Sequence, residues 1–276
     1  MITPFALSFC PTGMVPQRAD SPHVPLTPVE IADQVLECAE VGITSVHLHA
    51  RDEHGEPAWQ RDYYADIISR IRPHRPELVL CVTTSGRREA SIDRRSNVLD
   101  LEGDVRPDMA SLTLSSMNFA KSASVNAPDT IQALATTMLE RGITPELEIF
   151  DTGMLNFAHY LIGKGILRPP FVVNLLLGGV ATAQATALDL GSLMARLPEP
   201  SVWLVAGIGQ SQITANILGL VSGGGVRVGL EDNLHFDTAR TRLATNLELV
   251  TRIHRIAEEL ERPLMTSEQF REQVLV

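Results

Sequence analysis

The chain has 276 residues, 44% of them apolar, and its 33 acidic and 23 basic side chains leave a net charge of −10. This composition predicts a folded chain with a full hydrophobic core, and the negative charge argues against nucleic acid or an anionic membrane as a partner. The three cysteines, Cys10, Cys38 and Cys81, have no disulfide or zinc-knuckle spacing and favour a reducing cytoplasm, and no apolar run is long enough for a membrane-spanning helix.

Short apolar segments alternate with helical patterns along the whole chain. The expected strands are residues 4–10, 44–51, 78–84, 109–115, 145–151, 171–177, 202–208 and 226–230. The expected helices are residues 27–40, 62–72, 91–101, 128–141, 153–163, 183–196, 213–221 and 238–260, followed by a polar tail from about 261 to 276. Such alternation indicates parallel strands with right-handed crossovers. Eight units in ~250 residues match a (β/α)8 barrel, so we predict an α/β TIM barrel in one domain.

A doubly wound open sheet is the alternative architecture. It would carry a Gly-x-Gly-x-x-Gly motif after its first strand, and no such motif follows residue 10. Gly207-Ile208-Gly209, after the seventh expected strand, lacks the third glycine. The glycine pattern therefore favours the barrel.

Two histidines, His47 and His49, lie near the end of the second expected strand. Residues two apart on a strand share a face, with α-carbons about 6.6 Å apart, so both imidazoles can reach one metal ion at ~2.0–2.1 Å. Glu231, directly after the eighth strand, is the best third ligand. Two histidines and one carboxylate leave positions open for substrate, as catalytic zinc requires, although Fe(II) and Mn(II) accept the same set. The alternative is two strand-end histidines and a surface carboxylate.

Polar side chains gather at the expected C-terminal ends of the strands, which form the active-site face of such a barrel. Asp232 is a candidate general base, with a turn residue as the alternative role. Arg227 is a candidate anion-binding group, because a guanidinium binds carboxylates with two parallel bonds. Glu146 and Glu148 share one face of the fifth strand, and the sequence does not decide which faces the substrate.

Six stretches resemble the β-keto acid cleavage enzymes, in particular the 3-keto-5-aminohexanoate cleavage enzymes, and they occur in the family's order: residues 26–31, 47–52, 83–86, 109–113, 145–148 and 225–233. The last stretch, Gly-Val-Arg-Val-Gly-Leu-Glu-Asp-Asn, is highly specific. The resemblance implies a zinc-containing (β/α)8 barrel, usually a homotetramer. It implies conversion of a β-keto acid and acetyl-CoA into acetoacetate and a new acyl-CoA.

The resemblance also implies roles for single residues. His47, His49 and Glu231 resemble the zinc ligands. Asp232 resembles the general base, and Arg227 resembles the residue that assists it. The metal site expected from the strand pattern thus coincides with the one that the resemblance implies.

Four further positions resemble substrate-contacting residues of this family. Thr83 stands where the related enzyme has a serine, so a hydroxyl is kept for substrate binding and catalysis. Gly86 and Thr113 match two more of these positions. Glu148 is the preferred carboxylate on the fifth strand, with Glu146 as the alternative.

The first loop indicates the nature of the substrate's tail. In the related enzymes that act on the amino substrate, a glutamate follows Thr-Gly in this loop, whereas here Thr12-Gly13 precedes Met14 and Val15. An ammonium group beside these residues would lose a charge-assisted hydrogen bond worth roughly 1.5–3 kcal/mol. We therefore expect β-keto acids with neutral or apolar tails to be preferred.

Two other functions fit a paired-histidine barrel. A zinc-dependent amidohydrolase carries His-x-His on its first strand and further histidines on strands 5 and 6, where this chain has none. A non-catalytic, metal-dependent barrel that binds a keto acid is the other alternative. Asp232 and Arg227 beside the expected metal speak against that second alternative.

Overall fold

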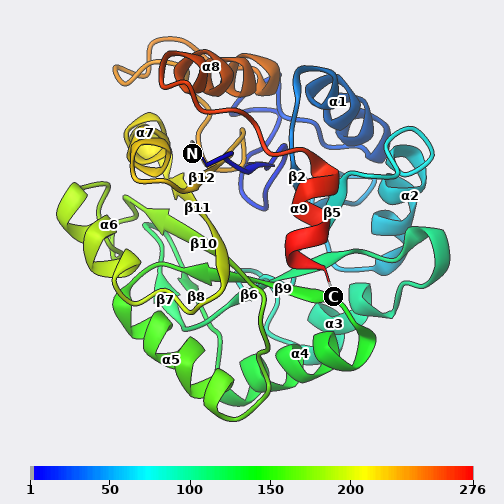
Figure 1. The fold of residues 1–276 in the computed structure, drawn as a ribbon. Coiled ribbons are helices and arrows are strands. Elements are labelled where there is room, and N and C mark those ends of the chain that lie inside the picture. The colour runs from blue at the N-terminus through cyan, green and yellow to red at the C-terminus, as the bar shows by residue number, and fades with distance from the viewer. Residues whose placement is uncertain (1–2, 276) are drawn as a thin grey trace.

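The computed structural model describes residues 3–275, in which eight parallel strands close into a barrel in the order β1-β12-β11-β10-β9-β6-β5-β2 (Figure 1). The strands are β1 (Leu7–Phe9), β2 (Ser45–Leu48), β5 (Val79–Val82), β6 (Met109–Thr113), β9 (Thr144–Ile149), β10 (Phe171–Leu177), β11 (Ser201–Gly207) and β12 (Gly225–Val228). Because β1 pairs with both β2 and β12, the sheet has no edge. The predicted barrel is confirmed, and the open sheet is excluded.

Helices surround the barrel and cover its strands (Figure 1). They are α1 (Pro28–Val41), α2 (Arg61–Ile71), α3 (Ile92–Ser96), α4 (Pro128–Arg141), α5 (Thr152–Gly163), α6 (Ala187–Met194), α7 (Gln212–Val221), α8 (Asn246–Glu259) and α9 (Ser267–Val274). Helix α1 shows the local cause: Thr27 and Glu30 form a capping box, and Ile31, Val35 and Cys38 are buried at helical spacing. Within residues 3–275, no helix is both long and apolar enough to cross a membrane.

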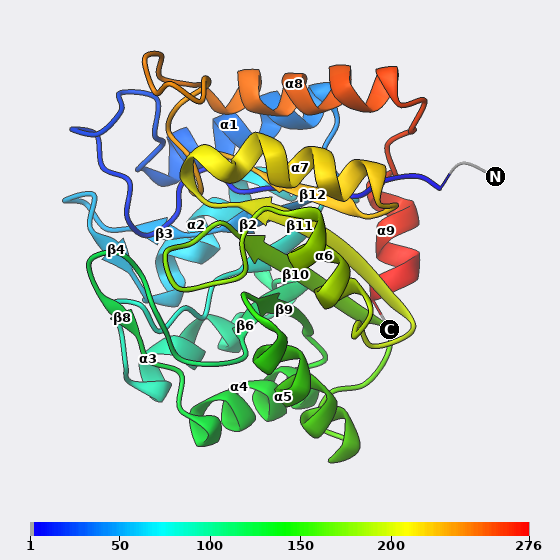
Figure 2. The ribbon, with the colours of Figure 1, turned by 90° about the vertical axis from the view of Figure 1, so that its left-hand side faces the viewer.

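The polar tail expected after residue 261 contains a helix instead. Helix α9 is capped by Thr266 and lies across one end of the barrel (Figures 1 and 2). Its Phe270 and Val274 are fully buried against strand residues such as Val79 and Met109. Glu268 and Glu272 of the same helix are exposed. Because polar residues outnumber the two buried apolar ones, the segment's average composition is polar even though one face of the helix is apolar.

Replacing Phe270 with alanine should therefore destabilise the whole barrel, since α9 closes the end that holds no active site. Loss of a fully buried phenylalanine typically costs about 3–5 kcal/mol of unfolding free energy. Urea unfolding would measure it, with exposed Glu272→Ala on the same helix as control. Equal midpoints for both variants would show that α9 does not contribute to the stability of the barrel.

Three expected helices begin or end elsewhere. The helix expected over 238–260 begins only at Asn246, because Asp237 accepts the backbone N–H groups of Thr241 and Arg242 and holds a turn. The helix expected over 183–196 is shortened to α6. The segment 91–101 contains α3 and the 3-10 helix η1 (Asn97–Asp100).

Short elements that the sequence did not predict extend the loops at the other end of the barrel. They are the two-stranded sheets β3 (Ala50–Arg51) with β4 (Pro57–Ala58) and β7 (Met117–Asn118) with β8 (Ala123–Ser124), and the 3-10 helix η3 (Gly209–Ser211). Figure 2 shows β4 and β8 at the end opposite α9. These loops therefore surround the polar residues at the C-terminal ends of the barrel strands. A further unpredicted 3-10 helix, η2 (Gly103–Val105), precedes β6 and lies at the α9 end, where Gly103 and Asp104 line a hollow together with Arg271.

Candidate active site

A cavity of about 340 Å³ opens at the C-terminal ends of the strands. Its lining includes seven of the ten candidate site residues named from the sequence: His49, Thr83, Thr113, Glu148, Arg227, Glu231 and Asp232. His47, Glu146 and Gly86 do not line it. The barrel thus brings together residues from β2, β5, β6, β9 and β12 that are far apart in the sequence.

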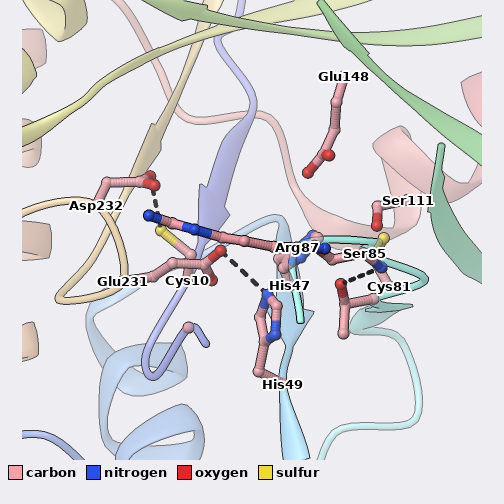
Figure 3. Close-up of polar contacts among 12 residues, drawn as sticks. Cys10, His47, His49, Cys81, Ser85, Arg87, Ser111, Glu148, Glu231 and Asp232 are labelled. Atoms are coloured by element: carbon pink, nitrogen blue, oxygen red, sulfur yellow. Dashed lines mark hydrogen bonds and ion pairs between the residues drawn. The ribbon is translucent and has the colours of Figure 1, made fainter. Parts of the chain in front are cut away.

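His47, His49 and Glu231 form a compact group whose candidate ligand atoms all lie within 4.8 Å of one another. His49 Nε2 lies 3.1 Å from Glu231 Oε1 (Figure 3). Two buried atoms of the group, His47 Nε2 and Glu231 Oε2, have no hydrogen-bond partner in the part of the chain that is described. Because unpaired buried polar atoms are costly, this arrangement fits residues that share a metal ion.

Glu146 orients the ring of His47 through Nδ1, the ring nitrogen that is not the candidate ligand atom. Its Oε2 lies 2.8 Å from His47 Nδ1, and both side chains are buried. A proton on Nδ1 leaves the lone pair of Nε2 directed at the group, as in carboxylate–histidine–metal arrangements. Burial and Arg227 act to lower the pKa of His47, but the charges of Glu146 and Glu231 and the hydrogen bond to Glu146 together outweigh them and raise it.

A second group of possible ligands, His47 with Cys81 and Glu146, lies deeper in the barrel. Burial raises the pKa of the Cys81 thiol well above its ordinary value, which disfavours the thiolate that a metal requires. Neither Cys81 nor Glu146 lines the cavity. The first group is therefore the better candidate metal site.

Arg227 holds Asp232 and Glu231 side by side. It is 1% exposed, and it donates from Nε to Asp232 Oδ2 at 3.0 Å and from Nη2 to Glu231 Oε1 at 2.7 Å. Burial tends to raise the pKa of Glu231, but Arg227 and the two histidines hold it well below its ordinary range. Burial raises the pKa of Asp232, and Arg227 opposes this only in part.

Cys10 also contacts Asp232, and sequence reasoning did not find it. Its thiol donates to Asp232 Oδ2 at 3.3 Å (Figure 3). The Asp232 carboxylate is thereby held by Cys10 and Arg227, whose Nη2 also donates to Oδ1 at 3.3 Å, and the residue lines the cavity. Nothing in the spacing of a lone cysteine after β1 indicates this contact, because it depends on the closure of β1 against β12.

Glu148, and not Glu146, faces the cavity. The two share one face of β9, but Glu148 lies nearer the open end and accepts a hydrogen bond from Thr113 Oγ1 at 2.5 Å. Its Oε1 lies 3.7 Å from Arg227 Nη1. Burial raises the pKa of Glu148 despite the opposing charges of His47 and Arg227.

Thr83 and Gly86 shape the loop after β5. Thr83 lines the cavity and accepts a hydrogen bond from the backbone N–H of Ser85 at 3.1 Å. A side chain at Gly86 would bring its Cβ to 2.6 Å from Arg95 Nη1 and 2.7 Å from the Val125 carbonyl. Gly86 thus allows close packing of two loops, and its expected contact with the substrate stays a prediction.

The fold and the site define an enzyme of the barrel class, with histidines, carboxylates and a buried arginine converging at its catalytic end. The model of the beta-keto acid cleavage enzyme family matches residues 4–275. The chain belongs to this family.

Characterised relatives agree with that assignment. The chain is 35% identical to a 3-oxoadipate:acetyl-CoA acetyltransferase of Cupriavidus necator, covering 98% of this chain and 94% of that one. It is 33% identical to a 3-keto-5-aminohexanoate cleavage enzyme of Fusobacterium nucleatum, covering 92% of each. The solved apo structure of ObcA has the same fold, with a TM-score of 0.82 at 23% identity, and the match covers 93% of this chain and 66% of that chain.

Proposed function

We propose that this enzyme combines a β-keto acid with acetyl-CoA and releases acetoacetate and a new acyl-CoA. The observation that carries the proposal is the pairing of Asp232 with Arg227 directly beside Glu231 and His49. A carboxylate in this position can act as the general base that removes a proton from the carbon next to a carbonyl group. The amidohydrolase alternative lacks support, since neither β9 nor β10 carries a histidine.

We propose His47, His49 and Glu231 as the ligands of one divalent metal ion, with zinc favoured. The unpaired His47 Nε2 and Glu231 Oε2 support this, as does the donor set of two imidazoles and one carboxylate. A bound metal ion would supply Lewis acidity for the keto oxygen and carboxylate of the substrate.

The side chains of the cavity would carry the proton transfer and position the substrate. Asp232 accepts the proton from the carbon between the two carbonyl groups, while Arg227 and Cys10 keep its carboxylate in place. The resulting carbanion attacks the thioester carbonyl of acetyl-CoA and expels the CoA thiolate. That thiolate attacks the former ketone, and cleavage of the carbon–carbon bond gives the new acyl-CoA and the enolate of acetoacetate. The enolate takes back the proton held by Asp232 and leaves as acetoacetate. We assign Thr83 and Thr113 to substrate binding, since both line the cavity.

We also propose that the tail of the substrate carries no positive charge. Met14 and Val15 line the cavity, and neither can pair with an ammonium group. Glu148 is already bonded to Thr113, and its raised pKa weakens it as a partner for a cation. These contacts support the prediction that a substrate with an amino group in its tail is disfavoured.

Incubation with acetyl-CoA and a panel of β-keto acids, followed by detection of acyl-CoA products, would test the function. We expect turnover of 3-oxohexanoate to exceed that of 3-keto-5-aminohexanoate by about tenfold to a hundredfold in kcat/KM, since the amine loses a charge-assisted bond. Binding of keto acids without any acyl-CoA formation would favour the non-catalytic barrel. A clear preference for the amino compound would contradict the tail assignment.

Replacing Glu146 with glutamine should weaken metal binding without removing a ligand. The amide cannot hold the Nδ1 proton of His47 as a carboxylate does, and loss of such partners typically costs about 10–100-fold in metal affinity or activity. Competition with a chelator would measure the affinity, with exposed Glu102→Gln as control. An unchanged affinity would show that Glu146 does not support the site.

The remaining expectations concern the assembly and its location. We propose a homotetramer, which rests on the family resemblance, and a cytoplasmic location. The three cysteines are free and buried, which agrees with a reducing compartment. Sedimentation analysis of the purified enzyme would test the tetramer.

A further inference from the structure

Arg87 lies in the wall of the cavity but has no part in the steps above. It follows the loop after β5 and is half-buried beside Met14, Val15 and Phe119. Its guanidinium lies over the Phe119 ring, with Cζ 3.8 Å from the ring centroid. Figure 3 shows Arg87 among the side chains around His49 and Glu231. The aromatic contact holds the cation at the cavity rather than in open solvent.

The guanidinium of Arg87 forms no salt bridge or hydrogen bond within residues 3–275. The hydrogen bond from Arg87 to Ser85 Oγ, 3.3 Å long, comes from its backbone N–H. Stacking occupies the face of a guanidinium, whereas its N–H groups lie in its plane and still require acceptors. The neighbouring Arg88 differs, because it points outward and pairs with Glu56 at 3.3 Å.

The carboxylates of the cavity are committed to other groups. Glu231 and Asp232 pair with Arg227, and Glu148 accepts from Thr113. Burial lowers the pKa of Arg87, and the charge of Arg88 adds to this effect. A cation in this position is therefore incompletely compensated, in a chain whose net charge is −10.

We propose that Arg87 binds an anionic oxygen group on the tail of the substrate, so that the enzyme prefers a β-keto dicarboxylate to a neutral β-keto acid of the same length. A carboxylate accepts two parallel N–H bonds from a guanidinium. Met14 and Val15 would contact the methylene groups between the two ends of the substrate. The inference rests on the proposed function and replaces a neutral tail by an anionic one.

The test compares 3-oxoadipate with 3-oxohexanoate, which have six carbons each and differ in the terminal carboxylate. We expect the wild-type enzyme to favour 3-oxoadipate in kcat/KM, and Arg87→Met to reduce the ratio of the two values by about tenfold to a hundredfold. Arg87→Lys should restore part of the preference. Arg88→Met is the matched control and should leave the ratio unchanged. Calorimetric binding of each keto acid, without acetyl-CoA, gives a readout independent of turnover.

Several outcomes would overturn the assignment. Equal loss for both acids in Arg87→Met would mean a structural role for the side chain. An increase confined to the KM of acetyl-CoA would mean that Arg87 binds a phosphate of the coenzyme. If wild-type enzyme forms no acyl-CoA but binds 3-oxoadipate through Arg87, the proposed reaction fails while the anion site stands.

Discussion

Replacing Asp232 with asparagine should reduce kcat by about 10²–10⁴-fold while the metal ion stays bound. Asparagine keeps the size of the side chain and an oxygen for the donors Arg227 Nε and Cys10 Sγ. It cannot accept the substrate proton. The large loss follows because no other carboxylate of the cavity is free to act as base: Glu231 is assigned to the metal and Glu148 is bonded to Thr113.

Single-turnover assays and elemental analysis of the same preparation would separate the two effects. Exposed Asp104→Asn serves as the control for the loss of one surface charge. A near-normal kcat in Asp232→Asn would reject the assignment of the base. Loss of the metal together with activity would instead place Asp232 among the ligands.

Replacing His49 with alanine should remove the metal ion and with it the activity. His49 Nε2 faces Glu231 at 3.1 Å, so its removal leaves His47 and Glu231 as the remaining ligands of the group. The loss of a direct ligand should exceed the roughly 10–100-fold effect expected for an indirect partner such as Glu146. Metal content per chain, measured by elemental analysis after dialysis, would check this.

The matched control is His54→Ala, since His54 is exposed on a loop of the same region. It should retain a full equivalent of metal. Equal metal content in the His49 and His54 variants would rule out the proposed site. Retained metal with lost activity in His49→Ala would mean that His49 binds the substrate rather than the ion.

Much of the catalytic end was predictable from sequence because two local rules act together. Strand alternation places His47 and His49 on one face, and parallel strands bring their C-terminal ends to one rim. Arg227, Glu231 and Asp232 follow from the same rule, since they lie on or directly after the last strand. These predictions needed only the alternation of strands and helices along the chain, the two-residue repeat within a strand, and the chemistry of the side chains.

The parts that could not be predicted depend on contacts between distant segments. Glu146 and Glu148 lie two residues apart on β9 and point to the same face, so the sequence does not show which of them is nearer the open end of the barrel. The contacts of Cys10 with Asp232 and of Arg87 with Phe119 join loops and strands that no local pattern relates. Loop lengths were also misjudged, because side chains such as Asp237 hold turns in place of helix.

The sequence by itself thus determined the barrel, its catalytic end and the residues that can hold a metal ion, because strand period, helix capping and side-chain chemistry are local properties. The tertiary structure alone decided that Glu146 supports His47 and that α9 covers one end of the barrel. It also decided that the Arg87 guanidinium stacks on Phe119 at the cavity with no hydrogen-bond or ion-pair partner among residues 3–275. Each of these depends on closure of the sheet and on which side chains it leaves unpaired, and such properties exist only once distant segments are packed.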